Sequence, residues 1–351
     1  MHTHPTATQP PVTATQSPVT ATPARMRAIV QTEYGTTADV LSLGELPVPT
    51  VESNEVLVHV QAAGLDRGTW HLMAGQPYAV RLAGFGVRAP KRPVPGADLA
   101  GVVAGVGSSV TRFTVGDHVV GIGRGTFAEY AAVREDKLTL RPDGLSATAA
   151  AALPISGITA LMGLTDIGRL RSGQHVLITG ASGGVGTHAV QLARALGAQV
   201  TGVCSAGKAD LVRSIGADHV IDYRRDDFTN GAVRYDLILD LAGNTPLRKL
   251  RRALTARGTL VIAGGEGGGR WFGGIDRQLR AVLLSPFVGQ RLAMFVAKEH
   301  HGMLDRLLEF VAAGTLTPVV GQTYSLAEAP LAMQHLIDGH ARGKLVIDVS
   351  R

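Results

Sequence analysis

The chain has 351 residues, of which 45% are hydrophobic and 18% are charged, and this composition excludes a wholly disordered protein. The single cysteine, Cys204, excludes an internal disulfide framework and any zinc or iron–sulfur site built on several cysteines, and it favours a cytoplasmic setting. The net charge of +6 comes from 34 Lys and Arg mixed with 28 Asp and Glu, which is more typical of a protein that binds small anions than of one that binds nucleic acid. No apolar run approaches the roughly 18–20 residues that span a bilayer, so we expect no nucleic acid and no membrane as partner.

Residues 1–25 consist almost only of Thr, Pro, Ala, Gln and Val, and they repeat a short Pro-Val-Thr-Ala-Thr unit. Such a segment cannot bury a core, so it predicts a disordered tail. Met26 opens the first patterned segment, and an alternative hypothesis is that translation begins there. The intact mass of the native protein would decide between the two.

Residues 26–150 contain short β-like runs, such as 55–60, 99–103 and 118–121, which Gly and Pro interrupt throughout. They predict a small β-rich domain. Residues 151–297 instead alternate strands with helices, with strands expected at 175–179, 199–203, 219–222, 235–240 and 258–262. Repeated β-α units predict a doubly wound parallel sheet. Residues 298–351 predict a helix, then two short strands around a helix at 326–337, and we expect this segment to return to the first domain.

The strongest motif is the loop Gly180-Ala181-Ser182-Gly183-Gly184-Val185-Gly186, which follows an apolar strand and opens a helix. Its glycines permit a tight turn and a close approach of the backbone to a pyrophosphate, and the helix start offers free N–H groups. The loop therefore predicts a Rossmann domain that binds a dinucleotide. A glycine-rich turn without a ligand is the plainer alternative.

The end of the strand expected at 199–203, the next one after the glycine loop, helps to decide between NAD and NADP as cofactor. Enzymes that use NAD usually place an acid there to bond the ribose 2′-hydroxyl, but this strand ends at Val203-Cys204-Ser205. Without a carboxylate to repel a 2′-phosphate, NADP(H) is the favoured cofactor, and Ser205 and Lys208 can offer it a hydroxyl and a cation. Lys208 could equally be a solvated residue of its helix.

Taken together, these segments resemble the medium-chain dehydrogenase/reductase superfamily. The motifs that carry the resemblance include Ala62-Ala63-Gly64-Leu65-Asp66, Pro95-Gly96-Ala97-Asp98, Val115-Gly116-Asp117-His118 and Gly157-Ile158-Thr159-Ala160, and it covers nearly all of residues 27–349. It implies a GroES-like first domain, a Rossmann second domain and a cofactor cleft between them.

Three departures from the zinc-dependent members point to the zinc-free branch, which includes quinone oxidoreductases, zeta-crystallin-like proteins and enoyl reductases. Where those members carry a cysteine, a His-Glu pair and a second cysteine, this chain has Asp66, Ala97-Asp98 and Ile155. We therefore expect no metal site.

The resemblance also implies the cofactor contacts and a homodimer formed through an edge strand near residues 292–296. Tyr223 could still be an ordinary aromatic at a strand end, and the loop at Gly264 and Gly265 could be a simple connector. The residues expected to bind the cofactor are Thr159, Gly180, Gly183, Gly184, Val185, Gly186, Ser205, Lys208, Tyr223, Gly264 and Gly265.

Without zinc to stabilise an alkoxide, hydride addition to a quinone or an α,β-unsaturated carbonyl is the favoured reaction, because its negative charge spreads into a phenolate or enolate. The catalytic candidates are Asp66, Trp70, His71 and Tyr78, with Tyr78 or His71 as proton or hydrogen-bond donor. Each has a plainer alternative: Trp70 as core packing, His71 as a surface histidine and Asp66 as a helix cap. A metal-free alcohol dehydrogenase and a non-catalytic NADPH-binding sensor remain alternative functions.

Overall fold

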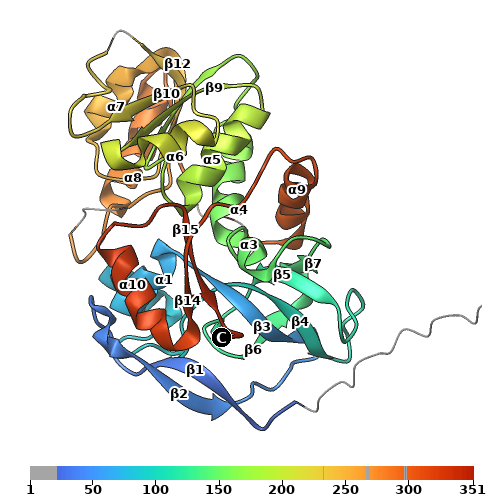
Figure 1. Cartoon of the computed structure of the whole chain (residues 1–351). Helices are drawn as coiled ribbons and strands as arrows, with labels where there is room; N and C mark the ends of the chain where they lie inside the picture. Colours follow the sequence, from blue (N-terminus) through green and yellow to red (C-terminus); the bar gives the residue numbers. More distant parts are fainter. Residues whose placement is uncertain (1–21, 232, 266–268, 296, 298) are drawn as a thin grey trace, which may run out of the picture.

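The computed structural model describes residues 22–231, 233–265, 269–295, 297 and 299–351. Most of the expected tail, residues 1–21, lies outside them. The described residues form two units, one above the other in Figure 1, and each is built on a large sheet. Figure 1 also shows helix α4 (Pro154–Met162) at the junction of the two units, with α5 (Gly184–Ala195) above it in the upper unit.

The upper unit is a parallel sheet of six strands in the order β10-β9-β8-β11-β12-β13, which confirms the predicted doubly wound Rossmann domain. From β8 the chain adds β9 and β10 on one side of this strand, and it then adds β11, β12 and β13 on the other side. The strand order therefore reverses between β8 and β11. Ligands bind at such a switch point. The strands are β8 (His175–Thr179), β9 (Gln199–Cys204), β10 (His219–Asp222), β11 (Tyr235–Asp240), β12 (Leu254–Ile262) and β13 (Arg291–Met294).

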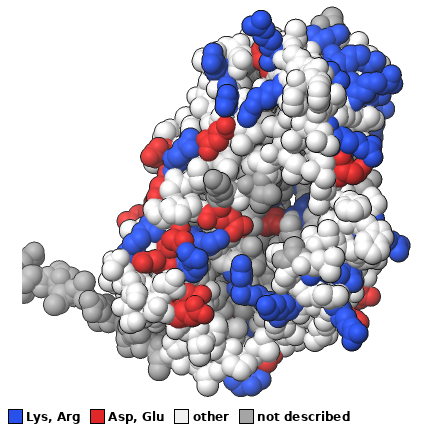
Figure 2. Space-filling view, turned by 180° about the vertical axis from the view of Figure 1, so that it is seen from behind, with Lys and Arg blue, Asp and Glu red and all other residues white. Residues whose placement is uncertain are grey.

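Helices on both faces connect these strands because each has one apolar face to bury against the sheet. They are α5 (Gly184–Ala195), α6 (Ala209–Ser214), α7 (Leu247–Ala253) and α8 (Ile275–Leu284). Figure 2 shows basic side chains gathered at the end of the molecule where Figure 1 places α7, and Arg248 and Arg252 of this helix are exposed.

The lower unit is a mostly antiparallel, GroES-like sheet of seven strands in the order β14-β15-β3-β4-β5-β7, with β6 paired to β3. Two of its strands come from the end of the chain, because β15 pairs with β3. A separate hairpin of β1 and β2 lies beside this sheet. The strands are β1 (Arg25–Gln31), β2 (Leu41–Pro47), β3 (Glu55–Leu65), β4 (Asp98–Val106), β5 (His118–Ile122), β6 (Tyr130–Arg134), β7 (Leu138–Leu140), β14 (Val320–Ser325) and β15 (Lys344–Asp348).

Helix α4 joins the two units through packed apolar side chains. Its Ile158 and Leu161 are fully buried in one cluster with Leu304 and Leu307 of α9 and with strands of the Rossmann sheet. Among the described residues, no helix is both long and apolar enough to cross a membrane. The other helices are α1 (Arg67–Ala74), α2 (Tyr78–Val80), α3 (Ala147–Ala151), α4 (Pro154–Met162), α9 (His301–Ala312) and α10 (Ala329–Ile337).

Candidate active site

A cavity of about 1130 Å³ lies where the carboxyl ends of the Rossmann strands face α1 of the lower unit. The glycine loop, the first turns of α1 and residues 223–228 all line it, and we call the part that residues 223–228 line its far end. The cavity brings together every residue expected to bind the cofactor. These residues are Thr159, Gly180, Gly183, Gly184, Val185, Gly186, Ser205, Lys208, Tyr223, Gly264 and Gly265.

The glycine loop needs its glycines for two measurable reasons. Gly180 has a φ of +67°, in the left-handed region that side chains disfavour. A Cβ on Gly186 would lie 2.2 Å from the Gly180 oxygen, so the helix start can approach the strand end this closely only without a side chain. The loop is also held from outside, because the Gly343 N–H donates to the Ser182 oxygen at 2.8 Å.

The far end of the cavity carries both signs of charge, from Arg224, Arg225, Asp226 and Asp227, but no acid lies at the end of β9. Lys208 lies in the cavity wall, and its ammonium donates to the oxygens of Gly339 and Ala341 at 3.0 and 2.8 Å. Partial burial, and then the charge of Arg342, lower the pKa of Lys208. Lys208 is therefore a wall residue tied to the turn after α10, and not a solvated residue of its helix.

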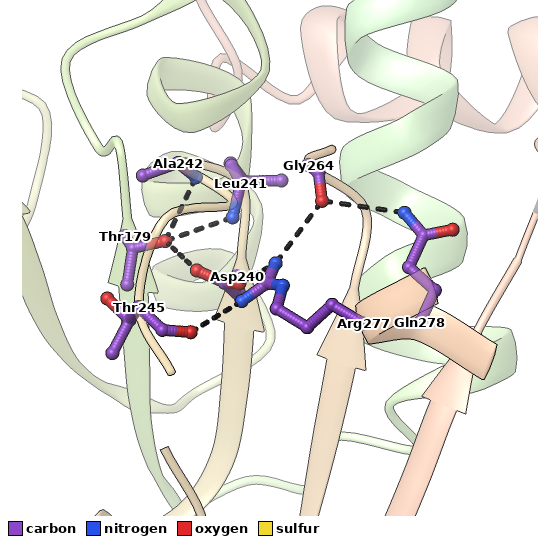
Figure 3. A network of polar contacts seen from close by, with 8 residues as sticks. All are labelled: Thr179, Asp240, Leu241, Ala242, Thr245, Gly264, Arg277 and Gln278. Atoms are coloured by element: carbon purple, nitrogen blue, oxygen red, sulfur yellow. Dashed lines mark hydrogen bonds and ion pairs between the residues drawn. The ribbon is translucent and has the colours of Figure 1, made fainter. Parts of the chain in front are cut away.

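A polar network, which local sequence patterns did not reveal, secures the loops after β11 and β12 that line the cavity (Figure 3). The Asp240 carboxylate accepts from the Thr179 hydroxyl at 2.7 Å and from Arg277 at 2.6 Å. The Thr179 oxygen in turn accepts the N–H groups of Leu241 and Ala242. Arg277 also donates to the oxygens of Thr245 and Gly264, which both line the cavity. One buried carboxylate thus holds the loops after β8, β11 and β12 together.

Asp66 and His71 line the cavity, on or next to the first turns of α1. Asp66 caps this helix, with its Oδ1 accepting from the Thr69 N–H at 2.8 Å, while its Oδ2 is buried without a hydrogen-bond partner in the described structure. The His71 ring lies 3.0 Å from the Gln76 oxygen through Nδ1, so Nδ1 carries a proton and donates. Asp66 is both a cap and a wall residue of the cavity.

Trp70 and Tyr78 are not among the residues that line the cavity. Trp70 packs against the core of the lower unit, and its ring N–H donates to the Thr36 oxygen at 3.4 Å. The Tyr78 ring meets Trp271 edge to face at 5.4 Å, and the Arg81 guanidinium lies 4.7 Å from its centre. For Trp70 the structure matches the plainer alternative, core packing.

Behind the glycine loop lies a buried charged pair that the sequence analysis also missed. The Lys344 ammonium is 2.6 Å from Asp98 Oδ2, and the two residues are 1% and 0% exposed. Burial, and to a lesser extent Asp66, raise the pKa of Asp98 to about 6 although Lys344 opposes this. A signal was present, because Asp98, Lys344 and Asp240 are charged residues at the ends of apolar strands.

His188 of α5 is fully buried under the same loop, where its Nδ1 donates to the Gly184 oxygen at 2.7 Å. Burial, with a smaller contribution from the nearby Lys344 charge, lowers the pKa of His188 to about 4, although its hydrogen bond to Gly184 opposes this. The unfolded chain binds a proton below about pH 6.5, but the folded protein does not until about pH 4. The unfolding free energy should therefore fall by about 3 kcal/mol on this account as the pH drops through that window.

Urea unfolding at pH 7, 5 and 4 measures this effect. His188→Leu should remove the effect, so the wild-type protein should lose more stability than this variant on acidification. His219→Leu, which changes an exposed histidine, is the matched control and should follow the wild type. Parallel curves for the wild type and His188→Leu would contradict the prediction.

Models of two known domains match the chain: the alcohol dehydrogenase GroES-like domain over residues 52–143 and a zinc-binding dehydrogenase domain over residues 215–347. A chloroplastic quinone oxidoreductase of Triphysaria versicolor is 34% identical over an alignment of 346 positions, which covers 92% of this chain and 98% of the relative. The 2-methylene-furan-3-one reductase of Solanum lycopersicum is 32% identical over 340 residues, 93% of this chain and 79% of the relative.

Solved structures agree with these relatives. The quinone oxidoreductase of Coxiella burnetii superposes with a TM-score of 0.81 at 28% identity, over 93% of this chain and 99% of its own. A mycobacterial protein solved in complex with NADPH has a TM-score of 0.77 at 26% identity, over 92% and 99%. The chain therefore belongs to the quinone oxidoreductase branch of the medium-chain dehydrogenase/reductase superfamily, whose members are oxidoreductases with a nicotinamide cofactor.

Proposed function

We propose that the protein transfers a hydride from NADPH to quinones or α,β-unsaturated carbonyl compounds without a metal ion. The observation that carries the proposal is the cavity, which joins the glycine loop and Thr159 to Asp66 and His71 of the lower unit. It has room for a dinucleotide and a small acceptor side by side. The named activities of the relatives from Triphysaria and Solanum support the same acceptor classes.

The residues present fit such a cofactor. Gly183 and Gly184 have no side chains to keep a pyrophosphate from the backbone at the start of α5, and Ser205 and Lys208 offer polar groups to a phosphate at the far end. Thr159 would contact the nicotinamide end. When bound, the cofactor supplies the hydride.

Metal independence rests on what Asp98 and Ile155, at two of the three diagnostic positions, do here. Both oxygens of Asp98 are engaged, one by Lys344 and one by the Ile155 N–H at 2.8 Å. Ile155 offers no metal-binding side chain. Within the part of the chain that the structure describes, no three His, Cys, Asp or Glu side chains converge as a metal site.

The side of the cavity expected to hold the acceptor is lined by Asp66 and His71 of the lower unit, which are its candidates for acid–base catalysis. His71 lines the cavity and Tyr78 does not, so we assign His71 as the donor to the developing phenolate or enolate oxygen. Because Nδ1 already donates to the Gln76 oxygen, the donor to the substrate is Nε2–H of the imidazolium, the form that is protonated on both ring nitrogens. Positioning of the two reactants then accounts for most of the rate enhancement.

NADPH oxidation against a benzoquinone, a naphthoquinone, an enone, an enal and an aldehyde, with and without a chelator, tests this proposal. We expect turnover of quinones or enones that the chelator leaves unchanged. Loss of turnover with the chelator would refute metal independence. Oxidation of simple alcohols alone would favour the alcohol dehydrogenase alternative, and tight NADPH binding without turnover would favour the sensor.

Cofactor preference provides a separate prediction. Lys208→Met should lower kcat/KM for NADPH by about 10- to 100-fold and leave that for NADH nearly unchanged, because a charge-assisted bond to the 2′-phosphate is lost. The matched control is Arg213→Met, which removes an exposed cation of α6 paired with Asp210 at 2.9 Å. An equal loss with both cofactors would contradict a phosphate-binding role.

We also propose a homodimer through the free edge of the Rossmann sheet. Strand β13 ends the sheet order, and exposed edges favour pairing with another chain. Beside it, Leu283 and Phe287 are 71% and 84% exposed, which is unusual for a monomer surface. Light scattering should give the mass of a dimer for the wild type and of a monomer for Leu283→Glu. A monomeric wild type would refute the proposal.

A further inference from the structure

The buried pair of Asp98 and Lys344 has no part in the chemistry proposed above, yet each of its polar atoms is engaged. Asp98 Oδ2 accepts from the Lys344 ammonium at 2.6 Å, and Oδ1 accepts the Ile155 N–H at 2.8 Å. The ammonium also donates to Ser156 Oγ at 3.0 Å. Removing two charges from water is costly, and an apolar pair of similar size would often be at least as stable. Stability alone therefore does not explain why the pair is present.

The pair joins segments that are far apart in the sequence. Asp98 begins β4 of the lower sheet, Ile155 and Ser156 belong to the first turn of α4, and Lys344 begins β15. Because Asp98 bonds both α4 and β15, a single carboxylate sets the position of the helix that carries Thr159 relative to the strand that follows Gly343.

The same strand reaches the glycine loop directly. Gly343 forms a parallel bridge with Gly183, and its N–H donates to the Ser182 oxygen at 2.8 Å. The stem of Lys344 also lies against Gly184, because a Cβ placed there would be 3.3 Å from Lys344 Cδ and 3.2 Å from Ser156 Oγ. The buried pair thus connects the loop expected to hold the pyrophosphate with the helix expected to contact the nicotinamide.

We propose that Asp98, Lys344 and Ser156 are positioning residues that set the distance between the glycine loop and α4, so that the two halves of the dinucleotide are held at the same time. The inference rests on the proposed cofactor site. Asp98 and Lys344 do not line the cavity, so the proposal assigns them no contact with the cofactor, whereas Ser156 does line it. Its signature is a selective loss, in which the whole cofactor binds more weakly while a fragment that reaches only the Rossmann unit does not.

The double variant Asp98→Leu/Lys344→Met tests the proposal, because it removes the pair without leaving an unpaired buried charge. Titration calorimetry with NADPH and with adenosine 2′,5′-bisphosphate compares the whole cofactor with its adenosine half. We expect the NADPH dissociation constant to rise by about tenfold or more, because a changed distance between the glycine loop and α4 misplaces one half of the cofactor, and that of the bisphosphate to stay within about twofold. Arg194→Met, which breaks an exposed pair with Asp218 at 2.6 Å on the same domain, should change neither value.

Equal weakening of both ligands, or binding as tight as in the wild type, would overturn the positioning role. If the double variant does not fold, Ser156→Ala removes one partner of the ammonium and should weaken NADPH alone; unchanged NADPH binding in Ser156→Ala would overturn the proposal. A wild-type protein that bound neither ligand would instead refute the cofactor assignment, and this inference with it.

Discussion

Gly186→Ala should destabilise the protein and weaken its cofactor binding together. The added Cβ would lie 2.2 Å from the Gly180 oxygen and 2.7 Å from the Ala181 backbone, and these atoms cannot turn aside as a flexible side chain can. The strand end or the helix start must move, at a cost of about 3 kcal/mol in unfolding free energy. The same movement displaces the loop, so the NADPH dissociation constant should rise by more than about tenfold.

Thermal denaturation with and without NADPH measures both effects. Gly183→Ala is the matched control, because its backbone angles suit any residue and the nearest atom to its Cβ would be the Gly180 oxygen at 3.5 Å. We expect this control to melt like the wild type without cofactor and to lose affinity only because the new methyl group occupies the ligand side. A Gly186→Ala protein as stable as this control would contradict the prediction.

Asp240→Ala should cost about 3–5 kcal/mol of unfolding free energy, because it leaves the largely buried Arg277 guanidinium without its counter-charge. The Arg277 side chain is 15% exposed and that of Asp240 is fully buried. The Thr179 hydroxyl loses its acceptor in the same step. Because this network holds the loops that carry Thr245 and Gly264, cofactor binding should weaken as well.

Urea unfolding of three variants tests this reasoning. Asp276→Ala breaks an exposed pair with Arg280 on the same helix, α8, and should cost about 0.5 kcal/mol or less. The double variant Asp240→Leu/Arg277→Met should recover most of the stability, because no buried charge remains unpaired. Equal losses in Asp240→Ala and Asp276→Ala would show that the buried carboxylate does not secure the loops.

The Rossmann strands could be predicted from local pattern because each is a short apolar run bounded by polar or glycine residues. The expected bounds of 175–179, 219–222 and 235–240 coincide with β8, β10 and β11. The glycine loop could also be predicted from local pattern, because its tight turn depends only on the seven residues 180–186. Local sequence is enough to predict a strand or a turn when the residues that determine it are neighbours in the chain.

The groups that brace the site could not be predicted in this way. Asp98 and Lys344 are 246 residues apart, and Asp240 and Arg277 meet only after α8 has packed against the sheet. The 3.6-residue period of α1 could have separated the residues that line the cavity from the one that packs into the core. Residues 67, 68 and 71 of α1 share a face and line the cavity, whereas Trp70 lies on the face that packs into the core.

The return of β15 to the lower sheet determines the order in which a nascent chain can fold. The first part of β3 pairs with β6, but Ala62–Leu65 pair with β15, which is synthesised nearly 280 residues later, after the whole Rossmann sheet. All strands of the Rossmann sheet emerge before β15. The Rossmann unit can therefore form while the edge of β3 that pairs with β15 is still unpaired. Unpaired strand edges favour aggregation, so we expect the partly synthesised chain to be most prone to aggregate before residues 344–348 emerge.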